Sequence, residues 1–220
     1  MSYSVHLRFS VTCLMVAGLV SHIDTSVYAQ YPGYTPVRDI VSFKKQFSQE
    51  STKVLSITSE FTQEKTLMAL TEKITSTGKF WFKRSNRVRL EYSKPFTYLV
   101  IMSGDRILLR DHQKETRVNA KSNKLFQQVN RIMIDCVQGT ILESKDFTTR
   151  VFENEITLLL EMTPVSKTLK EFFKTIVLSV DKKDYSAKSI LMNEPMGDIT
   201  LISFDHKKLN EPIADTVFAP

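Results

Sequence analysis

From Val54 onward, apolar and polar residues alternate in short runs that are separated by turn-forming residues. A period of two is typical of a strand with one buried face, whereas a helix repeats every 3.6 residues. Consecutive strands joined by tight turns favour antiparallel pairing. The alternation predicts strands over residues 54–62, 74–82, 88–92, 98–102, 107–109, 147–152, 156–162, 172–180, 187–193 and 198–204.

Two stretches follow the helical period instead. Thr35-Pro36 is typical of a helix start, because threonine caps well and proline fits the first helical position. We therefore predict a helix over about residues 36–52. Its apolar face carries Val37, Ile40, Val41 and Phe47. A second helix is predicted after the capping residue Ser122. The apolar face of this helix carries Leu125, Val129, Ile132 and Met133.

About ten twisted antiparallel strands tend to curl, and two amphipathic helices are too few to cover both faces of the sheet. The sequence therefore predicts a mainly β (α+β) fold. A single curled antiparallel sheet would form an incomplete β-barrel with the helices in its mouth, and such a barrel can hold an apolar ligand. No linker, repeat or low-complexity block is present, so residues 30–220 are expected to form a single domain.

The residues predicted on the concave face could line a cavity or form an ordinary packed core, which is the default for such residues. Periodicity does not separate the two readings. The residues concerned are Leu55, Ile57, Phe61, Phe80, Phe82, Val88, Leu90 and Tyr92.

Residues 1–29 have the pattern of a cleaved signal peptide. Arg8 precedes an uncharged, mostly apolar run at residues 11–20, which is shorter than the about 20 residues that a membrane-spanning helix needs. A polar stretch then ends in Val27-Tyr28-Ala29. Export in a bacterium with two membranes would place the protein in the periplasm. Cys13 would be removed, and Cys136 would remain without a disulfide partner.

N-terminal sequencing of the protein from the cell envelope is expected to begin at Gln30. The reason is that small or short residues stand at the first and third places before the bond that follows Ala29. A mature chain that still contains Arg8 and the apolar run would contradict this prediction.

The sequence offers little for catalysis. After the predicted cleavage only His112 and His206 remain, and the motifs H-E-x-x-H, C-x-x-C and G-x-S-x-G are absent. Cys136 has no histidine beside it and is expected to be a small buried residue. The acidic residues show no spacing typical of a metal site. We therefore expect a protein that is not an enzyme and that needs no metal and no other cofactor.

A basic cluster stands in a chain of formal net charge +6, at Lys83, Arg84, Arg87 and Arg89. Nucleic-acid sites combine basic residues with aromatic residues on one face, whereas alternation here sends the aromatic residues to the opposite face. We expect no nucleic-acid partner, but a solvated face or a docking patch for an acidic partner. Arg84 has the parity of Phe82, which would point it into the apolar face, where its guanidinium needs hydrogen-bond partners. The alternative is a solvated arginine in the turn.

Two sequence motifs resemble those of the LolA-type periplasmic outer-membrane lipoprotein carrier family. Residues 61–63 (FTQ) match the F-x-Q of that family, and residues 78–86 (GKFWFKRSN) match G-x-hydrophobic-W-x-K-R-P-N, with Ser85 in place of proline. Lys94-Pro95, the turn at residues 103–105 and the final DTVFAP at residues 215–220, similar to a closing D-x-x-F-x-P strand, follow in the family's order. Leu108 stands where the family often has tryptophan. The resemblance covers residues 37–220.

The resemblance implies a half-barrel whose concave face binds the acyl chains of a lipoprotein under a helical lid. It implies that Arg84 hydrogen-bonds backbone carbonyls of the lid and holds it shut when the carrier is empty. Acylated lipoproteins would be the cargo, taken from an inner-membrane lipoprotein-releasing transporter. They would be delivered to the outer membrane through a receptor or to the membrane itself. We expect the carrier to act as a monomer.

A lipid- or lipoprotein-sensing regulatory module on the same fold is the alternative function. A sensor usually needs a second domain to contact its partner, and 220 residues leave no room for one beside this sheet. A receptor form of the fold would need a lipidated cysteine, but Cys13 lies before the end of the apolar run. The carrier is therefore the favoured interpretation.

Overall fold

The computed structural model describes residues 31–69, 72–112, 114–119, 128, 131–132, 134–136 and 138–219. The cleavage site predicted after Ala29 lies outside these residues, as does the predicted helix start at Ser122. The described part of the second helix, between residues 128 and 138, is helical as predicted.

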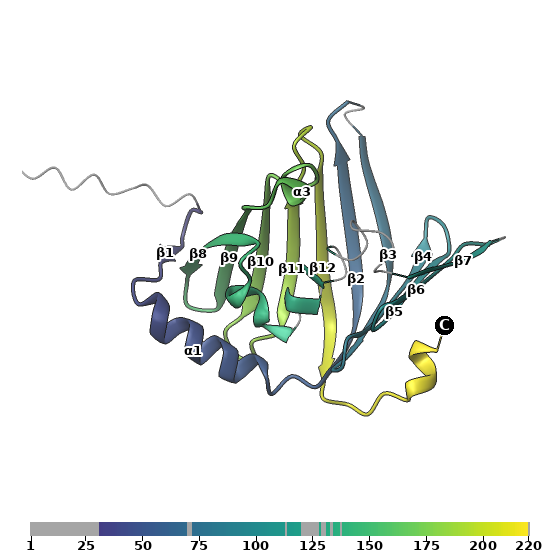
Figure 1. The fold of residues 1–220 in the computed structure, drawn as a ribbon, viewed down its shortest axis with the longest axis horizontal. Coiled ribbons are helices and arrows are strands. Elements are labelled where there is room, and N and C mark those ends of the chain that lie inside the picture. Colours follow the sequence, from purple (N-terminus) through teal and green to yellow (C-terminus); the bar gives the residue numbers. More distant parts are fainter. Residues whose placement is uncertain are drawn as a thin grey trace, which may run out of the picture.

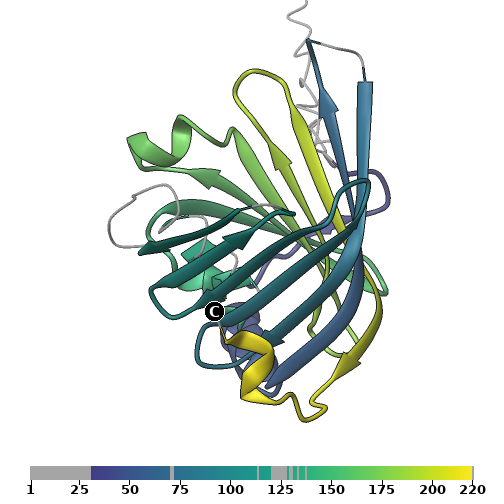
Figure 2. The same ribbon diagram turned by 90° about the vertical axis from the view of Figure 1, so that its right-hand side faces the viewer.

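Twelve strands form one antiparallel sheet in the order β1-β8-β9-β10-β11-β12-β2-β3-β4-β5-β6-β7 (Figure 1). Strands β1 and β7 are its two edges, so the sheet is open. Figure 2 shows how strongly it curls, with β4–β7 swinging round toward the side on which α3 lies. The strands are β1 (Thr35–Pro36), β2 (Ser56–Leu67), β3 (Glu72–Lys83), β4 (Arg87–Lys94), β5 (Tyr98–Ser103), β6 (Arg106–Arg110), β7 (Glu115–Asn119), β8 (Phe147–Glu153), β9 (Thr157–Pro164), β10 (Thr175–Asp181), β11 (Ala187–Asn193) and β12 (Ile199–Leu209). The predicted fold class is confirmed.

The long β2–β3 hairpin illustrates why the alternating pattern gives this sheet. Its register pairs Ile57 with Phe82 and Phe61 with Gly78, so the apolar residues of both strands share one face. A Cβ at Gly78 would lie 2.8 Å from the Phe61 ring and 2.1 Å from the Glu91 carbonyl oxygen. Only glycine therefore lets the ring of Phe61 lie across the neighbouring strand at this position.

Helix α1 (Ile40–Ser51) begins four residues later than the sequence predicts. Thr35 and Pro36 are not a helix start but form β1, which pairs with Phe152 and Glu153 of β8. Asp39 is the N-cap, and its carboxylate accepts a hydrogen bond of 3.0 Å from the Ser42 amide. The prediction was wrong here because pairing with a sheet edge satisfies the Thr35 backbone, and aspartate caps at least as well as threonine.

Several short elements were not predicted. They are β7, the short helix α3 (Lys167–Lys170) and the 3-10 turns η2 (Thr140–Glu143) and η3 (Asp215–Phe218). The strand predicted from Phe172 begins only at Thr175, because α3 draws the Phe173 amide into a hydrogen bond with the Leu169 carbonyl oxygen. The closing motif at residues 215–220 is likewise not a strand, since its described part forms η3.

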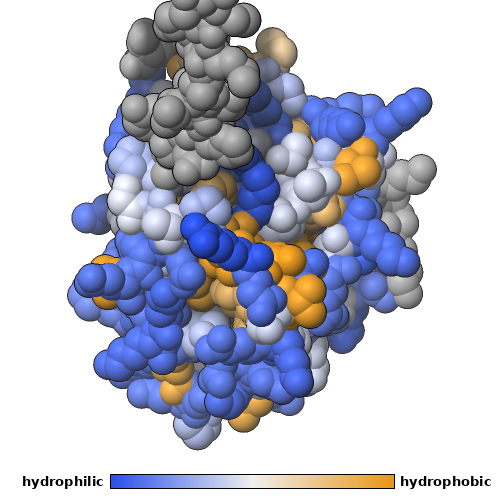
Figure 3. All heavy atoms as spheres, turned by 90° about the vertical axis from the view of Figure 1, so that its left-hand side faces the viewer, coloured by the Kyte–Doolittle hydropathy of each residue, from blue (hydrophilic) through white to orange (hydrophobic). Residues whose placement is uncertain are grey.

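The main hydrophobic core lies between the concave face of the sheet and the helical segments. Phe47 of α1, Ile134 and Cys136 of the second helical stretch, and Ile141 of η2 all belong to it. Two smaller apolar clusters occupy the outer face. One is covered by the C-terminal segment through Phe218, and the other packs against Tyr31 and Tyr34. Figure 3, which looks from the side of β1 and α1, shows apolar side chains gathered in a recess crossed by hydrophilic ones.

Candidate functional site: the concave face and its lid

The strands β2, β3 and β4 bring most of the predicted cavity residues together on the concave face. The register aligns Ile57 with Phe82, Phe82 with Val88, and Phe80 with Leu90. All of these are buried, and Tyr92 packs against the same cluster while only half-buried. The hydroxyl of Tyr92 donates a 2.9 Å hydrogen bond to the side-chain oxygen of Gln63. The residues with this shared face are Ile57, Phe61, Phe80, Phe82, Val88, Leu90 and Tyr92.

Leu55 does not belong to this face, although alternation placed it there. Its side chain is 56% exposed, while the preceding Val54 is 3% exposed and part of the core. Strand β2 begins only at Ser56, so the pleat that would align Leu55 with Ile57 has not yet started. The Leu55 amide is instead held by the Asn210 side chain, at 2.7 Å.

The lid fills the concave side with its own apolar side chains. The ring of Phe47 is buried and lies edge-on to Tyr185, and Phe43 packs against Phe47. Of the twelve residues of α1, however, only Phe47 and Ser51 are buried. Helix α1 therefore covers the sheet through few buried side chains of its own. Its displacement would expose little further apolar surface on the helix.

Arg84 connects the sheet to this helix. Its Nε donates to the Val54 carbonyl oxygen at 2.9 Å, and its Nη2 donates to the Ser51 carbonyl oxygen at 2.7 Å. Ser51 is the last residue of α1, where the final carbonyls have no partner within the helix and carry partial negative charge. Arg84 therefore supplies both the hydrogen bonds and the positive charge that this helix end favours.

The turn that carries Arg84 also contacts the second helical segment. Asn86 accepts a 3.1 Å hydrogen bond through its side-chain oxygen from the Gln138 amide. The next residue, Gly139, packs directly on α1, because a Cβ there would lie 2.0 Å from the Ser51 hydroxyl oxygen. The β3–β4 turn at residues 84–86 therefore holds two lid segments that also touch each other. Sequence reasoning singled out Arg84 and missed Asn86, Gln138 and Gly139.

The rest of the basic cluster binds the C-terminal segment. Lys83 and Arg87 both pair with Asp215, and their hydrogen bonds lower the pKa of its carboxyl group. Arg89 donates to the Val217 carbonyl oxygen at 3.1 Å. These side chains are therefore not simply solvated, because the chain's own residues pair with them, while a docking patch for an acidic partner stays a prediction. No local pattern marks residues 215–217 as the partners of these side chains.

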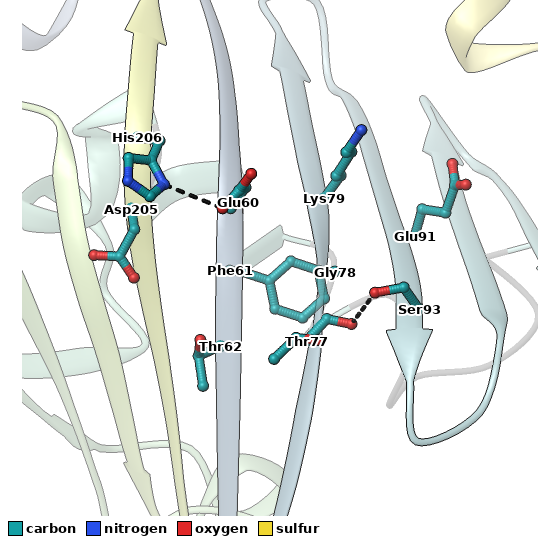
Figure 4. A pocket seen from close by; sticks show the side chains of 10 residues that line it. All are labelled: Glu60, Phe61, Thr62, Thr77, Gly78, Lys79, Glu91, Ser93, Asp205 and His206. Carbon is teal, nitrogen blue, oxygen red and sulfur yellow. Dashed lines mark hydrogen bonds and ion pairs between the residues drawn. The ribbon is translucent and has the colours of Figure 1, made fainter.

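A polar pocket of about 670 Å³ lies at the β12–β2–β3–β4 part of the sheet (Figure 4). His206 Nδ1 lies 3.1 Å from the Glu60 carboxylate oxygen Oε2. The Ser93 hydroxyl donates a 3.1 Å hydrogen bond to the Thr77 carbonyl oxygen. Its charged lining residues alternate with the apolar residues of the concave face, so they belong to the outer side of the sheet. This pocket is open, and Phe61 of the concave face reaches its lining beside Gly78.

The described residues show no grouping of histidine, cysteine and acidic side chains that could hold a metal ion. Cys136 is buried, and the desolvation of its thiol raises the pKa, which disfavours the reactive thiolate. His112 contacts the Thr97 hydroxyl at the surface. Within the same described part of the chain, no helix has the length and apolar character needed to cross a membrane.

The fold and this site define a class: an open β half-barrel whose concave apolar face is covered by helical segments that Arg84 and Asn86 tie to the sheet. The sequence model of the family "Outer membrane lipoprotein carrier protein LolA" matches residues 52–220. The chain belongs to this family, as its motifs at residues 61–63 and 78–86 indicated. No curated protein matches the sequence significantly.

The chain is also similar to several solved structures. A LolA superfamily protein of Nitrosomonas europaea aligns at 9% identity with a TM-score of 0.45, covering 80% of this chain and 97% of that one. A putative outer membrane lipoprotein-sorting protein domain of Vibrio parahaemolyticus aligns at 9% identity with a TM-score of 0.43. The alignment covers 80% of this chain and 94% of that one. A chain of the MucA/MucB complex of Pseudomonas aeruginosa aligns at 15% identity with a TM-score of 0.49. The alignment covers 81% of this chain and 60% of that one. Family membership rests on the sequence match.

Proposed function

We propose that this protein is a periplasmic carrier that binds the acyl chains of lipoproteins on the concave face of its sheet. It would take them from an inner-membrane transporter and deliver them to the outer membrane. The observation that carries the proposal is an aromatic-rich apolar face, part of whose cover is helix α1, which has only Phe47 and Ser51 buried. Membership of the lipoprotein carrier family supports the same function.

The chemistry of such a carrier is exchange of one apolar cover for another. In the closed state Phe47 of the lid packs against the core that includes Phe80 and Phe82. An acyl chain that enters would replace these lid contacts, so that the concave face stays out of water throughout. Because burial of apolar area drives both states, the two can lie close in free energy. The binding step needs no cofactor and no covalent chemistry.

The proposal is tested by purifying the protein from the cell envelope and identifying bound molecules by mass spectrometry. The expected result is acylated lipoprotein or its lipid portion, released in about equimolar amount. In a second arm, the delipidated protein should bind a synthetic diacylated lipopeptide and leave the same peptide without acyl chains unbound. Equal binding of both peptides, or binding of neither, would contradict the proposal.

A further inference from the structure

One hydroxyl group on the concave face has no hydrogen-bond partner. Ser59 lies between Ile57 and Phe61 in β2, on the same face as both, and its register partner across the hairpin is the buried Phe80. Its side chain is 4% exposed, and its Oγ contacts no donor or acceptor. Among the residues that the structure describes, the only other buried side-chain polar atom without a partner is Oε1 of Gln128.

Such a group is unfavourable in the closed protein, because it loses its hydrogen bonds to water without replacement. Ser56, a serine of the same strand with similar burial, is the comparison because its hydroxyl does have a hydrogen-bond partner. It is 6% exposed, and its hydroxyl donates a 2.7 Å hydrogen bond to the Glu211 carbonyl oxygen. Unpartnered buried groups are rare in native proteins, and a role in a second state is one physical reason for keeping one.

The sheet leaves Ser59 without a direct neighbour on its other side. Strand β12 bulges there, since Asp205 pairs with Glu60 and Lys208 pairs with Thr58. The bulge residue His206 turns outward to Glu60, and Lys207, which has the parity of the core-packed Leu209, donates to the Ser186 hydroxyl oxygen. Within β2 the hydroxyl is flanked on its own face by the apolar Ile57 and Phe61, and its register partner in β3 is the apolar Phe80.

We propose that Ser59 is a specificity-determining residue that donates a hydrogen bond to the ester carbonyl oxygen of a bound acyl chain. This inference rests on the proposed function and adds a substrate class to it: O-acylated lipids, in preference to ether-linked or plain hydrocarbon chains. An acyl chain has a single acceptor, its carbonyl oxygen, flanked by apolar groups. A lone hydroxyl donor in an apolar wall matches that arrangement. The hydroxyl unpartnered in the empty protein gains its partner when cargo enters.

The test compares two synthetic lipopeptides that differ only in their linkage, one with two palmitoyl esters and one with two hexadecyl ethers. Dissociation constants are measured for the delipidated parent protein and for Ser59→Ala, Ser59→Cys and Ser56→Ala. The parent should bind the ester about five- to tenfold more tightly than the ether, the ratio that one net hydrogen bond gives. Ser59→Ala should abolish the preference for the ester without weakening the binding of the ether. Ser59→Cys should show an ester preference between those of the parent and Ser59→Ala.

Thermal unfolding of the empty variants gives an independent readout. Ser59→Ala should leave the Tm unchanged or raise it, because it removes an unpartnered hydroxyl. Ser56→Ala should lower the Tm by about 2–4 °C, because it removes a satisfied bond, yet keep the ester preference. An equal affinity of the parent for ester and ether, or an ester preference that survives Ser59→Ala, would overturn the inference and leave the carrier function standing. Failure of the parent to bind either lipopeptide would overturn both.

Discussion

Arg84→Leu should make the protein hold acylated cargo roughly tenfold to a hundredfold more tightly and release it correspondingly more slowly. The two hydrogen bonds from Arg84 to the Ser51 and Val54 carbonyl oxygens exist in the closed, empty protein. A bond to a charged group contributes about 1.5–3 kcal/mol, and loss of the one that reaches α1, at Ser51, weakens the state that competes with cargo by about that amount. Loading should remain, whereas delivery should fail. A transfer assay that measures loading and release to an acceptor separately checks both steps.

The control for this change is Arg106→Leu, which removes an exposed arginine at the start of β6. It should load and release as the parent does. A solvated arginine at position 84 would give that same result, so unchanged release by Arg84→Leu would rule out the lock. The carrier function would survive that outcome.

Phe82→Ala should lower the free energy of unfolding of the empty protein by about 3–5 kcal/mol, the usual cost of removing a buried phenyl ring. Phe82 is 0% exposed and faces the lid from the centre of the β2–β3–β4 surface. Denaturant unfolding measures the change. A glutamate at this position would also weaken cargo binding, but it would destabilise the empty fold as well, so alanine is the cleaner substitution.

Trp81→Ala is the matched control, because the adjacent Trp81 lies on the outer face, half-buried against the cluster that contains Phe218. It should cost clearly less stability and leave cargo binding unchanged. Equal losses for the two variants would mean that the concave and outer faces are equally important to the core. That result would argue against a lid closed tightly on Phe82.

The sheet was predictable because its signal is local. Strand β11 has its predicted bounds, and the face shared by Phe80, Phe82 and Leu90 follows from alternation alone. Alternation failed at Leu55, where the strand had not begun, and at Thr35-Pro36, where an edge pairing with β8 outcompeted a helix start. Both errors have one cause: a contact distant in the sequence decides where an element begins.

The site was predictable only in part, for the same reason. Parity pointed Arg84 into the apolar face, but its partners Val54 and Ser51 lie 30 and 33 residues away in the sequence. Nothing local marks Asn86 and Gln138 as a pair, or Asp215 as the partner of Lys83. The missing partner of Ser59 is invisible in a sequence, because its neighbours in the sheet and the bulge in β12 must be known first.

The β3–β4 hairpin joins two tasks in one short length of chain. Its arms present Phe82 and Val88 to the concave face, and the turn between them grips both lid segments through Arg84 and Asn86. Because Phe82 and Val88 are register partners, the surface that would meet a ligand and the turn that holds the lid belong to one hydrogen-bonded hairpin. Occupancy and closure are then reciprocally linked.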